Sequence, residues 1–206
     1  VLYTRSRSRQ AVAVALSPSG GQAALLSVEA VNGVLNTVVE AFSLKTEAAE
    51  ALYSYTAADT LLYRLSYLEN DRLAAAGESG VYLLDEATAA NPTVFAMTGQ
   101  RLLSFAPAEH GLAAAVRSYG DTGGGTVIVW NSRGEECVRS DFSGDLRSLT
   151  GDSRGFVLLT DGYVQSISYT AVGQPVPVAA DGQHAVRGGD GAVVLGLSAL
   201  QTYALD

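Results

Sequence analysis

The chain has 206 residues, of which 48% are hydrophobic and 17% charged, a composition typical of a folded protein with one domain or two small ones. Its formal net charge of −8 repels phosphate backbones, so nucleic acid is not expected as the main partner. No apolar run is long enough for a transmembrane helix, and the single cysteine, Cys137, excludes an internal disulfide and metal sites built from paired cysteines.

The N-terminal segment begins at Val1 rather than Met, and it shows no secretory leader. We therefore expect the chain to be a piece of a longer protein, with any targeting segment or membrane anchor lying upstream. Arg5, Arg7 and Arg9 form a short basic run, which we interpret as a solvated strand or tail. The alternative is that this run contacts an acidic surface.

Short strand-like segments, separated by turns rich in Gly, Asp and Asn, follow one another along the chain, and their order repeats. Each repeat combines a continuous apolar strand, expected to be buried on both faces, with an alternating strand that shows one face to water. The predicted repeats cover residues 11–59, 60–98, 99–144, 145–181 and 182–206.

The first repeat pairs a strand at 22–26 with a longer one at 34–44 and ends on a strand near 50–56. Thr46–Tyr55 is the one segment where a short helix competes with this strand. In the second repeat, Leu73–Gly77 contains three consecutive alanines, which favour a helix. Turn residues lie on both sides, at Asp71 and Gly77, and leave too short a stretch for a helix. We therefore predict a strand there.

The later repeats carry the same pair of strands, at 112–116 with 126–131, 156–160 with 163–168, and 192–196 with 199–204. The fifth repeat has no fourth strand of its own. We predict that Val1–Ser8 supplies this strand and closes a ring. The alternative is an arc of a larger ring, whose open edges would pair with another copy and produce an oligomer.

A repeat of roughly 40 residues with about four strands is typical of a β-propeller blade. One blade cannot bury its two faces alone, so blades must stack. We therefore predict a single all-β domain over residues 1–206, a β-propeller or propeller arc built from about five four-stranded antiparallel blades.

The segment Val127–Asn131 resembles the third strand of a WD-type blade, where an aromatic–Asp pair often stands; here the pair is Trp130-Asn131, and the second repeat has Leu84-Asp85. The chain is thus similar to bacterial β-propeller repeat proteins, loosely WD-type or quinoprotein-like. It also looks like the propeller part of membrane-anchored proteins of unknown function. The resemblance implies an architecture and an extracytoplasmic or cell-surface location, without a defined activity.

Motifs that would carry catalysis have simpler interpretations. Gly151–Gly155 matches G-x-S-x-G, but a strand follows where a nucleophile elbow needs a helix, so we predict a hairpin turn. His110 and His184 lack metal-ligand spacing, and Asp71 suits a turn better than a calcium loop. Gly120–Gly125 precedes a strand rather than the helix of a phosphate loop. We predict no catalytic residue, no cofactor and no metal site.

One arginine stands near the start of each of the last four repeats. The simpler interpretation is that these arginines are separate solvated or turn-bonded side chains, and the alternative is that they line a channel as a basic ring that binds an anion. They are Arg64, Arg101, Arg147 and Arg187.

The function expected from these observations is that of a non-enzymatic binding scaffold with a protein or peptide partner, working outside the cytoplasm. Rigid repeats offer a broad face lined by loops, and loops carry most binding residues. The alternative is a propeller enzyme of hydrolase, lyase or lactonase type with its site at the central channel. Spacing along the sequence does not reveal residues that several blades bring together.

Overall fold

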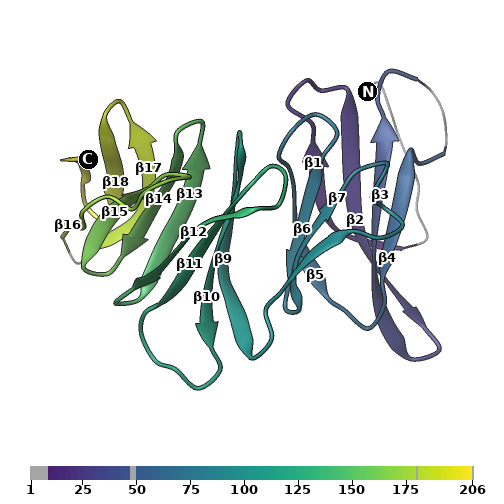
Figure 1. Ribbon diagram of the computed structural model, residues 1–206, viewed down its shortest axis with the longest axis horizontal. Coiled ribbons are helices and arrows are strands. Elements are labelled where there is room, and N and C mark those ends of the chain that lie inside the picture. The colour runs from purple at the N-terminus through teal and green to yellow at the C-terminus, as the bar shows by residue number, and fades with distance from the viewer. Residues whose placement is uncertain (1–8, 47–49, 180, 206) are drawn as a thin grey trace. The chain divides into compact units, whose positions relative to one another are not determined.

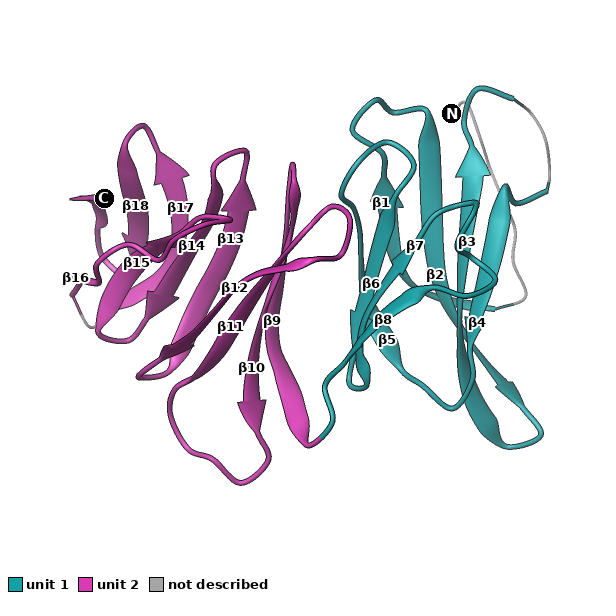
Figure 2. Cartoon of the chain, in the orientation of Figure 1, with its two compact units in different colours: residues 1–98 teal, residues 99–206 magenta. Residues whose placement is uncertain are grey.

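The computed structural model describes residues 9–46, 50–179 and 181–205. Strands joined by turns and bends account for these residues, and no helix, membrane-spanning or otherwise, occurs among them (Figure 1). The chain divides into two compact units, Val1–Thr98 and Gly99–Asp206, shown in teal and magenta in Figure 2.

Unit 1 contains two four-stranded antiparallel sheets, each with its strands in sequence order. Sheet 1 comprises β1 (Gln10–Leu16), β2 (Gln22–Val31), β3 (Val34–Ser43) and β4 (Tyr53–Ala57). Sheet 2 comprises β5 (Leu62–Tyr67), β6 (Leu73–Gly77), β7 (Gly80–Leu84) and β8 (Thr93–Ala96).

Unit 2 contains three antiparallel sheets, with four, four and three strands among the described residues. Sheet 3 comprises β9 (Gln100–Ala108), β10 (Gly111–Ser118), β11 (Gly125–Asn131) and β12 (Glu136–Phe142). Sheet 4 comprises β13 (Leu146–Asp152), β14 (Gly155–Thr160), β15 (Tyr163–Ile167) and β16 (Val176–Pro177). Sheet 5 comprises β17 (Gly182–Gly188), β18 (Gly191–Gly196) and β19 (Leu200–Ala204).

The alanine-rich strand β6 is buried along its whole length, and the prediction of a strand rather than a helix is confirmed. It pairs with β5 on one side and β7 on the other. Leu73 and Ala75 share the face that packs with Leu26 and Val39 of sheet 1. Small side chains suit this position because stacked sheets come close together there.

In unit 2 the apolar strand β14 is buried on both faces, as its uninterrupted run of hydrophobic residues predicts. Phe156 and Leu158 pack with Ala113 and other residues of sheet 3. The alternate residues Val157 and Leu159 pack with sheet 5. Sheet 4 thus forms the middle layer of the unit.

The first strand of every sheet carries one β-bulge, and the first strands of stacked sheets within a unit pack against each other. A bulge adds one residue and bends the strand, so it marks a common structural position in the repeats. The bulged residues are Val12, Tyr63, Leu103, Arg147 and Gln183.

Two predictions concern the segments Thr46–Tyr55 and Val1–Ser8, which the structure describes in part or not at all. The helix considered for Thr46–Tyr55 is wrong at its C-terminal end, because Tyr53 begins strand β4 and pairs with Ala41 of β3. The segment forms a strand because alternate residues face the core: Tyr53 and Ala57 are buried, whereas Ser54 and Thr56 between them are exposed. Residues 47–49 of that segment lie outside the described residues, as does Val1–Ser8, the predicted closing strand.

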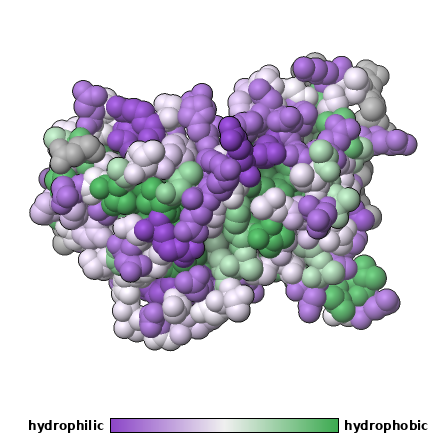
Figure 3. All heavy atoms as spheres, viewed as in Figure 1, coloured by the Kyte–Doolittle hydropathy of each residue, from purple (hydrophilic) through white to green (hydrophobic). Residues whose placement is uncertain are grey.

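Several large apolar side chains stay exposed on sheets 1 and 5. Val14 and Leu16 of β1 are 66% and 64% exposed, and Leu197 in the β18–β19 turn and Leu200 of β19 are 81% and 65% exposed. On the face shown in Figure 3, hydrophobic patches likewise lie among hydrophilic surface. Closure of the ring and oligomer formation stay predictions.

Candidate functional site

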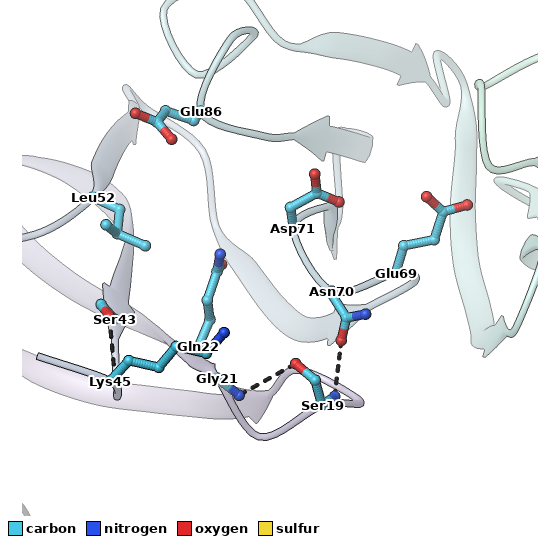
Figure 4. Close-up of a pocket in the computed structure, with 10 residues that line it drawn as sticks. All are labelled: Ser19, Gly21, Gln22, Ser43, Lys45, Leu52, Glu69, Asn70, Asp71 and Glu86. Atoms are coloured by element: carbon cyan, nitrogen blue, oxygen red, sulfur yellow. Dashed lines mark hydrogen bonds between the residues drawn. The ribbon is translucent and has the colours of Figure 1, made fainter.

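A pocket of about 690 Å³ lies in unit 1, where turns of sheets 1 and 2 come together (Figure 4). Its lining comes from the β1–β2 turn, the segment between β3 and β4, the β5–β6 turn and the turn after β7. The lining residues are Ser19, Gly21, Gln22, Ser43, Lys45, Leu52, Glu69, Asn70, Asp71 and Glu86.

Two hydrogen bonds tie the turns of the two sheets together beneath and beside this pocket. The backbone N–H of Ser19 donates to Oδ1 of Asn70 at 2.8 Å, which joins the β1–β2 turn to the β5–β6 turn. The hydroxyl of Tyr67 donates to Oε1 of Gln22 at 3.3 Å. Gly20 has a φ of 68°, a left-handed conformation that lets the first turn close. The pocket is therefore shaped before any ligand arrives.

The charge of the pocket comes from Glu69, Asp71 and Glu86 against Lys45, or three negative charges against one positive charge. All four side chains are exposed, and none of them forms an ion pair within the described part of the chain. Figure 4 shows Asp71, Glu86 and Lys45 around one open space, with Glu69 beyond Asp71. Among the described residues, the lining of this site therefore has a surplus of negative charge.

The neighbouring acid Asp85 has a structural role instead. Its Oδ2 accepts a hydrogen bond from Nη2 of Arg72 at 2.9 Å, and its Oδ1 accepts from the backbone N–H and the hydroxyl of Thr88, both at 2.8 Å. Burial pushes the pKa of Asp85 upward, but the hydrogen bonds from Arg72 and Thr88 outweigh burial and leave the pKa below its ordinary value.

This lowered pKa leads to a prediction about stability. Because the pKa of Asp85 is lower in the folded state, its carboxylate stabilises the fold above the unfolded-state pKa, and this contribution is lost as the pH falls through the folded-state value. We expect Asp85→Asn to lower the free energy of unfolding at neutral pH by about 1–2 kcal/mol and to flatten its acid dependence. Urea titrations followed by tyrosine circular dichroism check this. Asp71→Asn is the control, because Asp71 is exposed and forms no ion pair among the described residues. Parallel pH profiles for the wild type and Asp85→Asn would contradict it.

Two buried tyrosines lie below the pocket, between sheets 1 and 2. Tyr53 is 9% exposed, and its hydroxyl has no hydrogen-bond partner in the described residues. Burial raises its pKa, and the charges of Tyr67, Asp85, Asp71 and Glu86 raise it further, so the hydroxyl lies at the acidic end of the interface. Burial also raises the pKa of Tyr67 to about 12. Both phenols are neutral donors at physiological pH.

This arrangement suits an extended cation. Within the described ranges, no group of three or more His, Cys, Asp or Glu side chains is placed to hold a metal ion. The carboxylates of Glu69, Asp71 and Glu86 are thus spread around the opening, where separate basic groups can meet separate acids. Sequence reasoning missed this set because it interprets Glu69–Asp71 as an ordinary turn. The only advance signal is that acids stand in two turns of one repeat, the β5–β6 turn and the turn after β7.

The four arginines considered as a ring do not occupy equivalent positions in their sheets. Arg64 directly follows the bulged residue of β5, and Arg147 is itself the bulged residue of β13. Arg101 precedes the bulged residue of β9 by two positions, and Arg187 follows that of β17 by four. A strand advances about 3.3 Å per residue, so the last two differ by about 20 Å along their strands relative to the bulge. The anion ring stays a hypothesis.

The remaining sequence motifs lie where turns were predicted. Gly151–Gly155 forms the β13–β14 hairpin, with strand β14 following it. Gly120–Gly125 leads into β11, and Nε of Arg117 donates to the Gly124 carbonyl at 2.5 Å, so this loop is held by a buried arginine. His110 is exposed in the β9–β10 turn, and His184 is exposed on β17.

Comparison with known proteins gives a family. A family profile described as a family of unknown function (DUF5711) matches residues 4–172. Among curated proteins, none matches the sequence.

Solved structures give the fold. An oligogalacturonate lyase in complex with manganese matches with a TM-score of 0.61 and 10% identity over 87% of this chain and 56% of that one. The N-terminal domain of Nup159 matches with a TM-score of 0.52 and 8% identity over 88% and 51%. The β-propeller domain of Cps50 (Swd1) from Myceliophteria thermophila matches with a TM-score of 0.50 and 11% identity over 97% and 84%.

The chain spans about half the length of the lyase and Nup159 structures. At these identities the likeness concerns the fold alone. It confirms the predicted fold class, an all-β propeller architecture built from antiparallel blades of three or four strands.

Proposed function

Since this chain belongs to a family of unknown function, DUF5711, membership brings no activity with it, and we propose from its own geometry that it is a non-enzymatic binding module. The partner is a protein or peptide whose basic side chains enter the acidic pocket of unit 1. The observation that carries the proposal is the set of unpaired carboxylates of Glu69, Asp71 and Glu86 around one preformed opening.

The physical basis is electrostatic complementarity on a rigid support. Lysine and arginine side chains carry their charge at the end of a flexible stem, so they can reach carboxylates that are spread around a rim. The β5–β6 turn, which holds Glu69 and Asp71, is joined to sheet 1 by the Ser19–Asn70 hydrogen bond, and the Tyr67–Gln22 hydrogen bond lies beside it. Little ordering of the protein is therefore needed on binding, which favours affinity.

The phenol of Tyr53 is buried and does not line the pocket, so the three carboxylates alone carry the binding proposal. The extracytoplasmic location and the upstream anchor expected from the sequence stay predictions.

The test uses the full chain and a fluorescent nona-arginine peptide, with nona-glutamate as the opposite probe. We expect nona-arginine to bind, nona-glutamate not to bind, and added salt to weaken binding because the contacts are solvent-exposed. The triple variant Glu69→Gln/Asp71→Asn/Glu86→Gln is expected to weaken binding about tenfold, the combined effect of three screened ion pairs. Fluorescence anisotropy measures both effects.

A matched control separates the pocket from the overall charge. Glu78, Glu109 and Asp121 are exposed turn acids that do not line this pocket, and replacing them by Gln, Gln and Asn removes the same net charge. This control variant is expected to bind nona-arginine like the wild type. Equal weakening in the two triple variants would mean that the peptide responds only to net charge, and the proposal would fall.

A further inference from the structure

A separate pocket of about 420 Å³ lies in unit 2 between sheets 4 and 5. Arg187 of β17 and Arg154 of the β13–β14 turn contribute its charged groups, and Ser166 and Ser168 from the end of β15 contribute hydroxyls. None of the described residues that line it is acidic. The chain has a net charge of −8, whereas this cavity is lined by two guanidinium groups and no acidic residue.

Arg187 is the fixed part of this pocket. Its side chain is 10% exposed, and its Nη2 donates to the carbonyl of Phe156 at 3.2 Å. Its Nε lies 3.0 Å from Oδ2 of Asp152 but is not aligned for a hydrogen bond, so this contact is an ion pair only. These contacts hold the guanidinium at the sheet 4–sheet 5 interface while one edge of it lines the cavity.

Arg154 is the adjustable part. Its Nη2 donates to the carbonyl of Gly189 in the β17–β18 turn, and its Nη1 lies 3.5 Å from Oδ1 of Asp190. Asp190 is fully exposed, and the Arg154 side chain is 51% exposed, so water and salt screen this pair and it contributes little. An anion inside the pocket can replace Asp190 as the partner of Arg154 without leaving a buried charge unpaired.

From these contacts we propose that the Arg154–Arg187 pocket binds the oxyanion group of a small ligand, a phosphate or a carboxylate. Guanidinium groups present N–H donors in a planar fork that matches the oxygens of both anions. The volume falls within the range of small-molecule sites. The site shares Arg187 with the hypothetical ring but none of its other members, and it does not rest on the acidic pocket of unit 1.

The test titrates the full chain with inorganic phosphate and, separately, with acetate by isothermal titration calorimetry. We expect one of the two anions to bind at one site with millimolar or tighter affinity, and the comparison identifies which oxyanion the pocket prefers. Arg154→Gln is expected to weaken this binding about tenfold, the loss of one charge-assisted contact. Arg133→Gln, which removes an exposed turn arginine of the same unit, is the matched control and is expected to have no effect.

Arg187→Gln is expected to abolish binding, and fluorescence of Trp130, the only tryptophan, checks that unit 2 of this variant is folded. Arg154→Gln keeps the proposal testable if Arg187→Gln unfolds, because the Arg154 side chain is half exposed. Absence of binding by both anions overturns the proposal. Equal affinities of Arg154→Gln and Arg133→Gln overturn it as well, since the anion would then lie elsewhere.

Discussion

Phe156→Ala is expected to lower the free energy of unfolding of unit 2 by about 3–5 kcal/mol, the range measured for large-to-small changes at buried aromatic positions. Phe156 is 0% exposed and belongs to the cluster that joins sheets 3 and 4. Its ring meets that of Tyr169 edge to face, with centroids 5.8 Å apart. Truncation removes this contact and leaves a cavity at the middle layer of the unit, where rigid strands cannot collapse to fill it.

Urea unfolding followed by the fluorescence of Trp130 measures this effect, because Trp130 lies on β11 within the same unit. Tyr119→Ala is the control, since Tyr119 is 64% exposed and its loss is expected to change the free energy by no more than about 0.5 kcal/mol. A loss below that of the control would mean that sheets 3 and 4 do not share a core through Phe156.

Gly151→Val is expected to destabilise unit 2 by about 3 kcal/mol, at the upper end of overpacking effects. A Cβ at residue 151 would lie against the carbonyl oxygen of Pro107 on β9 and 2.9 Å from Cβ of Ala108. Both neighbours belong to sheet 3, so one of the two sheets must move. Valine favours strands by propensity, and a loss of stability therefore reports the close approach of the sheets rather than a poor local fit.

Gly162→Val serves as the comparison, because no atom lies within 4 Å of a Cβ built there, and its effect is expected to be small. Thermal and urea unfolding of both variants give the difference. This experiment also tests the G-x-S-x-G match. Gly151 is required here by sheet packing, so Ser153→Ala is expected to unfold like the wild type while Gly151→Val does not. Tolerance of valine at 151 would leave the glycine without this packing explanation.

The candidate sites were only partly visible in the sequence. Glu69 and Asp71 are recognisable as turn residues, and Lys45 as the only lysine, but nothing in their spacing places them around one pocket. Arg154 shows the same limit. It lies within a predicted hairpin turn, yet its neighbour Arg187 comes from a strand of the next sheet. Such pairs depend on how sheets stack, and stacking leaves no local pattern.

The arginine ring stays a hypothesis, and its four residues show how a small local feature affects register. The four residues lie near the starts of their repeats when positions are counted along the chain. Each first strand, however, contains a bulge, and the arginines stand at different distances from it. A bulge shifts every later residue by one place relative to the neighbouring strand. Counting along the chain therefore does not give the level of a side chain in its sheet.

The sequence by itself determined the strands, the turns and the blade-like repeat, because alternation of apolar residues, continuous apolar runs and turn residues act over a few positions. Strand β6 with its three alanines and the hairpin at Gly151–Gly155 are of this kind. Only the tertiary structure decided that the carboxylates of sheet 2 and Lys45 of sheet 1 line one pocket and that Arg154 and Arg187 share another. Charge interactions across stacked sheets depend on register and distance in space, and neither is encoded by a short stretch of chain.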